Sequence, residues 1–292
     1  MTAPLARIAL GTVQFGMPYG VTNATGQVPE REVGRILELY AEQGGDTLDT
    51  AIAYGDSERV LGRFDLSRFR VISKLPPLPE EEHDAAGWVR RMVEGSLSRL
   101  GIECLHGLLL HRPADLLGPA GVPLREGLRA VQEGGLVEKV GLSIYEPEEL
   151  TVFESSLVQA PYNVFDRRLE ETGWGARLLE RGAEVHVRSA FLQGALLATP
   201  DSLPRQFAPW RRAWERWWAW LEDTGQGPLV ACLAQALAPK WVGRVVVGVE
   251  NAVQLAQIAE AAAQALSDTA PLPPPELAVS DRRLINPSLW PG

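Results

Sequence analysis

Cysteine and histidine are scarce in this 292-residue chain, which contains 2 cysteines and 4 histidines. Cys104 and Cys232 each lie within an apolar run, and neither belongs to a Cys-x-x-Cys pair. A disulfide framework or a thiolate-rich metal site needs more cysteines at closer spacing. We therefore expect both thiols to be reduced core residues, and we predict no metal site.

Long hydrophobic runs and an excess of positive charge are also missing. No stretch of about 18 uninterrupted apolar residues occurs, so no transmembrane helix is expected. Gly11 soon interrupts the first apolar run, so the N-terminus lacks the hydrophobic core of a secretion signal. The formal net charge of −9 argues against a protein that neutralises nucleic-acid or membrane phosphates. These absences predict a soluble cytoplasmic protein that binds neither nucleic acid nor membranes.

Apolar strand-like runs recur along the whole chain, in which 46% of residues are hydrophobic and 22% are charged. Most of these runs are continuously apolar, which is typical of parallel strands buried on both faces. The expected strands are Ile8–Phe15, Thr47–Ala51, Arg70–Leu75, Leu105–His111, Lys139–Ile144, Val158–Tyr162, Glu184–Ser189 and Arg244–Val249.

Helical patterns separate these strands, and glycines stand where several helices should end. The expected helices are Arg31–Gln43, Ser57–Phe64, Trp88–Leu100, Leu124–Glu133, Pro147–Ser155, Leu169–Arg181, Pro228–Leu237 and Ala252–Leu266. Eight β-α units predict one (β/α)8 TIM barrel over residues 1–292. The main alternative is a doubly wound sheet, which normally carries a glycine-rich phosphate turn after its first strand. The segment Gly16–Gly20 does not match such a turn.

A tryptophan-rich insert, Thr199–Gln226, follows the seventh expected strand. Four of its tryptophans are spaced to share one helical face: Trp210, Trp214, Trp217 and Trp218. This spacing predicts an amphipathic helix packed on the barrel, with a lid or a subunit contact as the alternatives. The proline-rich segment that follows Pro271 is expected to cross the surface in an extended conformation.

Three consecutive expected strands end in ionisable side chains. Asp49 lies near the end of the second strand and Tyr54 in the loop after it, Lys74 lies near the end of the third strand, and His111 ends the fourth. In a barrel these ends face one common mouth. An ammonium group favours the phenolate form of a nearby tyrosine, a carboxylate can hold that ammonium, and an imidazole can donate a hydrogen bond to a carbonyl oxygen. Each residue alone has a structural alternative as a cap, a loop end or a hydrogen-bonding residue, but the set predicts an active site.

The ordered segments of this chain resemble the aldo-keto reductase superfamily over essentially its whole length. The matching segments are Leu10–Thr12, Leu48–Ala51 with Tyr54 and Gly55, Ser73 with Lys74, Leu110–Arg112, Val140–Ser143, Val158–Asn163 and Val245–Gly248. The resemblance implies a (β/α)8 barrel that reduces an aldehyde or ketone with a nicotinamide cofactor, or oxidises an alcohol or sugar in reverse. It also implies that Tyr54 is the general acid, tuned by Lys74 and Asp49, and that His111 orients the carbonyl group.

The resemblance further implies a set of cofactor-binding residues. They are Gly11, Thr12, Asp49, Ser143, Gln159, Arg188, Ser189, Gly194, Gly248, Glu250, Asn251 and Gln254. Two positions depart from the family pattern. Ile144 stands where the family usually has asparagine, and the segment around Glu250 lacks the cation that commonly holds the adenosine 2′-phosphate. The family as a whole favours NADP(H), which is therefore the expected cofactor, and NAD(H) is the alternative because a carboxylate at Glu250 would repel a phosphate.

Other functions stay open on the sequence alone. A barrel that binds the cofactor without catalysis could serve as a redox sensor or a regulatory subunit. A barrel isomerase or lyase would need no nicotinamide. For the reductase, the expected partner is a small carbonyl or sugar-like substrate, and the expected state is a monomer or a small homo-oligomer.

Overall fold

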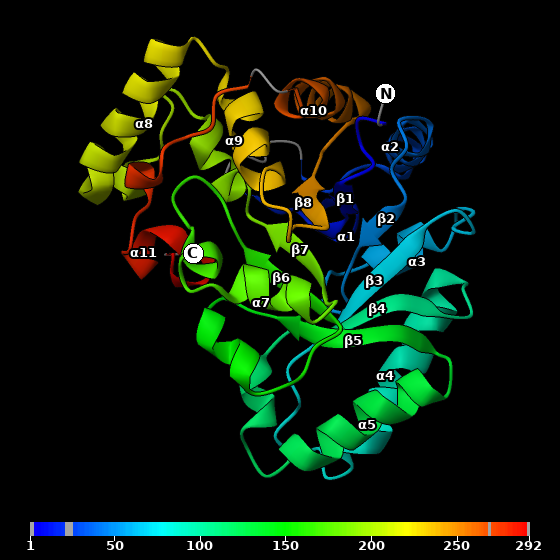
Figure 1. The fold of residues 1–292 in the computed structure, drawn as a ribbon. Coiled ribbons are helices and arrows are strands. Elements are labelled where there is room, and N and C mark those ends of the chain that lie inside the picture. The colour runs from blue at the N-terminus through cyan, green and yellow to red at the C-terminus, as the bar shows by residue number, and fades with distance from the viewer. Residues whose placement is uncertain (1–2, 21–25, 268–269, 291–292) are drawn as a thin grey trace.

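A computed structural model describes residues 3–20, 26–267 and 270–290. Its eight strands are all parallel and close into a barrel in which β1 pairs with β8 (Figure 1). The strands are β1 (Ile8–Gly11), β2 (Thr47–Asp49), β3 (Arg70–Leu75), β4 (Leu105–Leu110), β5 (Val137–Ser143), β6 (Leu157–Pro161), β7 (Glu184–Arg188) and β8 (Arg244–Gly248). The predicted (β/α)8 fold is confirmed, and the doubly wound alternative is wrong.

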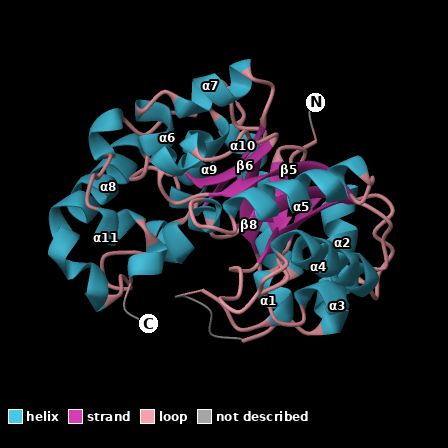
Figure 2. Cartoon of the chain, turned by 90° about the horizontal axis from the view of Figure 1, so that it is seen from below, coloured by secondary structure: helices cyan, strands magenta, loops and turns pink. Residues whose placement is uncertain are grey.

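Helices surround the strands on the outside of the barrel (Figure 2). The α-helices are α1 (Val13–Gly16), α2 (Glu30–Glu42), α3 (Ser57–Leu61), α4 (Ala85–Leu100), α5 (Gly121–Glu133), α6 (Arg168–Glu171), α7 (Trp174–Glu180), α8 (Arg211–Thr224), α9 (Pro228–Leu237), α10 (Ala252–Ala265) and α11 (Arg282–Ile285). The 3₁₀ helices are η1 (Pro113–Leu116), η2 (Pro147–Thr151), η3 (Leu192–Leu197), η4 (Arg205–Trp210), η5 (Pro275–Leu277) and η6 (Pro287–Leu289). None of the helices in the described ranges is long and apolar enough to cross a membrane.

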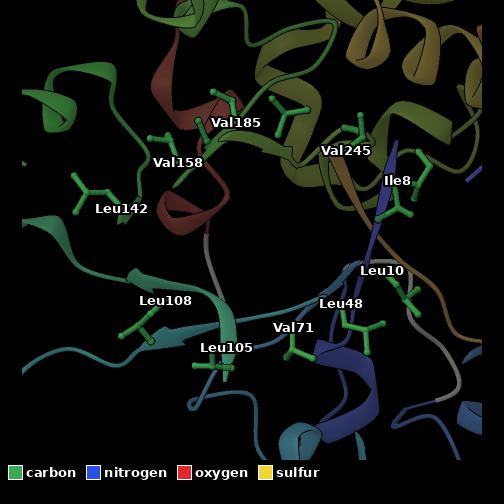
Figure 3. Packing of buried hydrophobic residues seen from close by; sticks show 14 of the residues in the cluster. Ile8, Leu10, Leu48, Val71, Leu105, Leu108, Leu142, Val158, Val185 and Val245 are labelled. Carbon is green, nitrogen blue, oxygen red and sulfur yellow. The ribbon is translucent and has the colours of Figure 1, made fainter. Parts of the chain in front are cut away.

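Apolar side chains fill both sides of the barrel wall. Strand residues such as Val71 and Leu108 belong to the large core cluster that the surrounding helices complete (Figure 3). Ile72, Leu109 and Leu157 form a separate small cluster. Their strands, β3, β4 and β6, are not all neighbours, so these side chains meet only inside the barrel. This double burial explains why the strands are continuously apolar.

Several expected boundaries are wrong for local reasons. β1 ends at Gly11 instead of Phe15, because the chain turns there into the short helix α1. The helix expected over Leu169–Arg181 is two helices, α6 and α7, separated where Gly173 adopts a left-handed φ of 73°. The segment Pro147–Ser155 forms only the 3₁₀ helix η2. Cys104 is partly exposed, whereas Cys232 is buried as expected.

The tryptophan-rich insert contains the expected amphipathic helix, α8. Trp214 and Trp217 are fully buried in a second apolar cluster, beside α11 on one side of the barrel (Figure 1). The proline-rich tail is not simply extended over the surface. It forms η5, α11 and η6, and it inserts Leu277, Leu284 and Ile285 into the same cluster. The tail and the insert therefore stabilise each other.

The first residues of β4 and β7 meet in a polar cluster around Glu184. This carboxylate accepts hydrogen bonds from His106 Nε2 at 3.0 Å, Lys139 Nζ at 2.5 Å and His186 Nε2 at 2.7 Å. The hydrogen bond to Glu184 raises the pKa of His106 despite its burial. The cluster lies at the N-terminal end of the barrel, where polar groups contribute to stability instead of catalysis.

We predict that Glu184→Ala lowers the free energy of unfolding by about 3 kcal/mol at pH 6, because it removes the acceptor of three hydrogen bonds, two of them from buried histidines. The raised pKa of His106 means that its contribution is complete below about pH 6.5 and is lost as the pH rises through the folded-state value. The stability gap between wild type and variant should therefore narrow between pH 6 and pH 9 in urea unfolding. Glu260→Ala, at an exposed position of α10, should cost less than about 0.5 kcal/mol. A gap that widens with pH would contradict this assignment.

Candidate active site

The loop that carries Tyr54 is held against the start of the chain. Ser57 Oγ donates a hydrogen bond to Thr12 O at 2.8 Å, and Thr12 Oγ1 donates to Asp49 O at 3.0 Å. Gly16 packs so closely that a Cβ atom there would lie 1.9 Å from Tyr54 O. Only glycine permits this approach, which fixes the Tyr54 backbone at the mouth of the barrel.

A buried ion pair lies beneath Tyr54. Lys74 Nζ lies 2.6 Å from Asp49 Oδ1, with side-chain exposures of 1% and 4%. Gln159 Nε2 donates to the other carboxylate oxygen of Asp49 at 2.6 Å, and Lys74 Nζ also donates to Thr50 O at 2.9 Å. Burial opposes the charged ammonium, but Asp49 and the Tyr54 hydroxyl outweigh it, so the pKa of Lys74 is raised. The lysine therefore stays protonated inside the barrel.

Tyr54 connects this ion pair to His111. Lys74 Nζ lies 5.0 Å from the centroid of the Tyr54 ring, and the ring centroids of Tyr54 and His111 are 6.1 Å apart at an interplanar angle of 76°. Burial, followed by the charges of Lys74 and Arg188, lowers the pKa of His111 to about 4. At neutral pH the imidazole is therefore uncharged and carries one N–H donor.

A cleft of about 410 Å³ opens from these residues towards β8 and α10, a size typical of small-molecule sites. Gly248 lines it, and a side chain there would strike Gln14, with a Cβ atom 2.6 Å from Gln14 Nε2. Gln14 Oε1 is buried and has no hydrogen-bond partner in the described part of the chain. An elongated polar ligand that enters beside Gly248 would donate a hydrogen bond to this oxygen. The absence of a side chain at Gly248 and the unpaired Gln14 Oε1 therefore mark a place for a polar ligand.

The segment after β7 forms one wall of this cleft in a strained conformation. Ser189, Leu192 and Gln193 have φ values of 59°, 48° and 52°, which cost non-glycine residues roughly 1–3 kcal/mol each. Asn163 Nδ2 donates to Ser189 O at 3.0 Å, and Trp217 Nε1 donates to Leu196 O at 3.0 Å. Left-handed turns of this kind present backbone amides that suit phosphate oxygens. The insert thus supports a wall of the cleft from behind.

Polar side chains already satisfy the start of α10 at the far end of the cleft. Asn251 Oδ1 accepts a hydrogen bond from Gln254 N at 2.9 Å, and Gln254 Oε1 accepts from Glu250 N at 2.8 Å. The carboxylate of Glu32, in α2, accepts from Ala252 N at 2.8 Å. This hydrogen bond is the main reason why the pKa of Glu32 is lowered. A carboxylate therefore already occupies the anion-binding end of the helix.

The structure brings most of the predicted site residues together in one cleft. Those that line it are Gly11, Thr12, Asp49, Tyr54, Gln159, Arg188, Ser189, Gly194, Gly248, Glu250 and Gln254. Lys74 lies behind Asp49, Ser143 pairs with Gln159 between neighbouring strands, and Asn251 caps α10. Across the described ranges, no group of three or more His, Cys, Asp or Glu side chains is arranged to hold a metal ion.

Sequence patterns did not point to several residues that shape the cleft. Gln14 and Leu197 line the cleft, and Ser57 organises the Tyr54 loop. Gly16 was visible only as a mismatch to another motif, because close backbone contacts leave no sequence signature. Phe165 packs on Trp214, with the ring centroids 4.9 Å apart, and does not line the cleft.

Comparison with known families agrees with this geometry. Residues 7–270 match the Aldo/keto reductase family. The chain belongs to this family. The barrel is therefore an aldo/keto reductase barrel.

Individual relatives are distant. The chain is 25% identical to the aldo-keto reductase YhdN of Bacillus subtilis over 189 residues, covering 57% of this chain and 53% of that protein. It is 30% identical to an aldo-keto reductase of Mycobacterium sp. (strain JLS) over 161 residues, covering 53% of this chain and 55% of that protein. The chain thus spans about half the length of the curated relatives it matches.

Solved structures cover more of the chain. The crystal structure of PA4992 from Pseudomonas aeruginosa matches with a TM-score of 0.65 and 26% identity, over 89% of this chain and 91% of that chain. The holo form of AKR11C1 from Bacillus halodurans matches with a TM-score of 0.68 and 20% identity, over 91% and 88% of the two chains. The second similarity supports the shared fold alone.

We predict that Asp49→Asn destabilises the protein by about 3–5 kcal/mol at pH 7, because it leaves the Lys74 ammonium buried without a counter-charge. The double variant Asp49→Asn/Lys74→Met should be more stable than Asp49→Asn alone, since it buries no charge. Chemical denaturation of the wild type, Asp49→Asn, Lys74→Met and the double variant measures the coupling free energy between Asp49 and Lys74. If the losses of unfolding free energy in the two single variants add up to the loss in the double variant, Asp49 and Lys74 do not stabilise each other.

Proposed function

We propose that this protein is an NAD(P)H-dependent oxidoreductase that reduces a small aldehyde or ketone, or oxidises the corresponding alcohol. The observation that carries the proposal is the Lys74–Asp49 ion pair, buried within the barrel directly beside the Tyr54 ring and the cleft. Burying two charges costs several kcal/mol of desolvation free energy per ion, and apolar residues would stabilise the barrel at lower cost. A buried ion pair at the mouth of a barrel therefore points to a role in catalysis.

The proposed mechanism assigns one task to each side chain. When bound, the nicotinamide supplies a hydride to the carbonyl carbon. Tyr54 gives its hydroxyl proton to the carbonyl oxygen, and the Lys74 ammonium stabilises the phenolate that is left. Neutral His111 donates a hydrogen bond to the same oxygen and orients it. Asp49 and Gln159 hold Lys74 in position, and water returns the proton to Tyr54.

Tyr54→Phe should lower kcat for reduction of 4-nitrobenzaldehyde by roughly 10²- to 10⁴-fold, the usual contribution of a general acid. Only a hydroxyl is removed, so the thermal unfolding midpoint and the dissociation constant for NADH should change little. These two measurements serve as controls. Full activity in the variant would exclude Tyr54 as the acid, and a lack of activity in the wild type towards every carbonyl compound would reject the proposed function.

For the cofactor, we propose a preference for NAD(H) over NADP(H), although the family as a whole favours NADP(H). Two carboxylates support this. Glu250 lines the cleft, and Glu32 accepts a hydrogen bond from the first residue of α10. A 2′-phosphate near this helix would face two like charges and would compete with Glu32 for the same amide. A ribose hydroxyl can instead donate to a carboxylate.

Fluorescence titration should show that the wild type binds NADH at least about tenfold more tightly than NADPH, a difference of roughly 1.4 kcal/mol. The double variant Glu32→Gln/Glu250→Arg should bind NADPH more tightly by a similar factor, because it removes two negative charges and adds a positive one. Glu38→Gln is the matched control, since it neutralises an exposed glutamate of α2. Tighter binding of NADPH than of NADH by the wild type would contradict this preference.

A further inference from the structure

Arg188 ends β7 at the mouth of the barrel, where neighbouring residues fix its side chain. Its Nη2 donates a hydrogen bond to Ile144 O at 2.9 Å. Its guanidinium carbon lies 4.1 Å from the centroid of the Tyr145 ring. A stacked and hydrogen-bonded guanidinium loses little further side-chain entropy when it binds a ligand. Its remaining N–H groups are therefore preorganised.

The same guanidinium belongs to the catalytic cleft. Arg188 lines it together with Tyr54 and Tyr19. Its charge acts on His111, whose pKa is lowered first by burial, then by Lys74 and then by Arg188. A group bound by Arg188 would thus lie in the same cleft as the Tyr54 ring.

Nearby carboxylates do not neutralise this charge. Asp49 is paired with Lys74, and Glu146, next to Tyr145, is paired with Arg168 and with Arg282. Within the ranges that the structure describes, no carboxylate lies at ion-pair distance from Arg188. Glu250 also lines this cleft, but it forms no ion pair with Arg188. A partly buried cation that no carboxylate contacts is suited to an anionic ligand.

We propose that Arg188 selects carbonyl substrates that carry an anionic group, a carboxylate or a phosphate, on the side of the molecule away from the reacting carbon. This inference rests on the proposed function, because it adds a substrate class to the same cleft. The guanidinium fork matches the geometry of either oxyanion. Tyr19 lines the cleft and supplies an aromatic surface for the part of the substrate between its anionic group and its carbonyl.

Matched substrate pairs test the proposal in the unmodified protein. Reduction of 4-carboxybenzaldehyde is compared with that of its neutral methyl ester, and glyceraldehyde 3-phosphate is compared with glyceraldehyde. We expect kcat/KM to be about 10- to 100-fold higher for the anionic member of at least one pair, mainly through KM. The pair that shows the preference distinguishes a carboxylate from a phosphate. Turnover of all four compounds without a preference would overturn this inference alone, whereas turnover of none would reject the proposed function.

Variants then assign the preference to Arg188. Arg188→Gln should abolish the difference in kcat/KM between anionic and neutral substrates. Arg188→Lys should retain part of this difference, because lysine keeps the charge but lacks the planar guanidinium group. Arg177→Gln is the matched control, since that guanidinium also stacks on an aromatic ring, Trp174 at 5.2 Å, but outside the cleft. The NADH dissociation constant of each variant is measured in parallel. A variant that weakens NADH binding and leaves the substrate ratio intact would show that Arg188 serves the cofactor instead.

Discussion

The buried ion pair between Lys74 and Asp49 is the constraint on which the site depends. Two charges inside a barrel are costly unless each is paired and hydrogen-bonded. Gln159 and Thr50 O complete the hydrogen bonding of the pair. Because these groups come from three strands, β2, β3 and β6, the closed barrel itself sets their geometry. The fold therefore determines the arrangement that we propose to be catalytic.

The rest of the cleft is built outwards from this pair. The hydrogen bond of Ser57 and the close contact at Gly16 hold the Tyr54 loop beside the ion pair. The neutral His111 ring packs edge-on against the Tyr54 ring at the mouth of the barrel. Further out, the strained segment after β7 is supported by Trp217 of α8. A rigid interior and a supported outer wall are what a site needs to position two reactants and exclude water.

Sequence reasoning predicted the parts that depend on periodicity and on strand ends. Apolar runs predicted all eight strands, and ionisable residues at or near the ends of three of them pointed to Asp49, Lys74 and His111. It missed features that depend on contacts between distant segments. Gly173 broke a helix that its hydrophobic pattern made continuous. The proline-rich tail was expected to be extended, but a second apolar cluster, completed by α8, folds it into short helices. The carboxylate of Glu32 at α10 could not be foreseen, because 220 residues separate it from Ala252.

Single-turnover kinetics with NADH and with NADH deuterated at C4 would probe the catalytic role of the buried ion pair without interference from product release. We predict that the wild type transfers deuterium to the carbonyl carbon in one phase that slows with the heavier isotope. Lys74→Met should slow this phase by at least about 10²-fold, since the phenolate loses its cation. NADH binding should survive, because Lys74 lies behind Asp49. An unchanged rate of transfer in Lys74→Met would contradict the catalytic role of the ion pair.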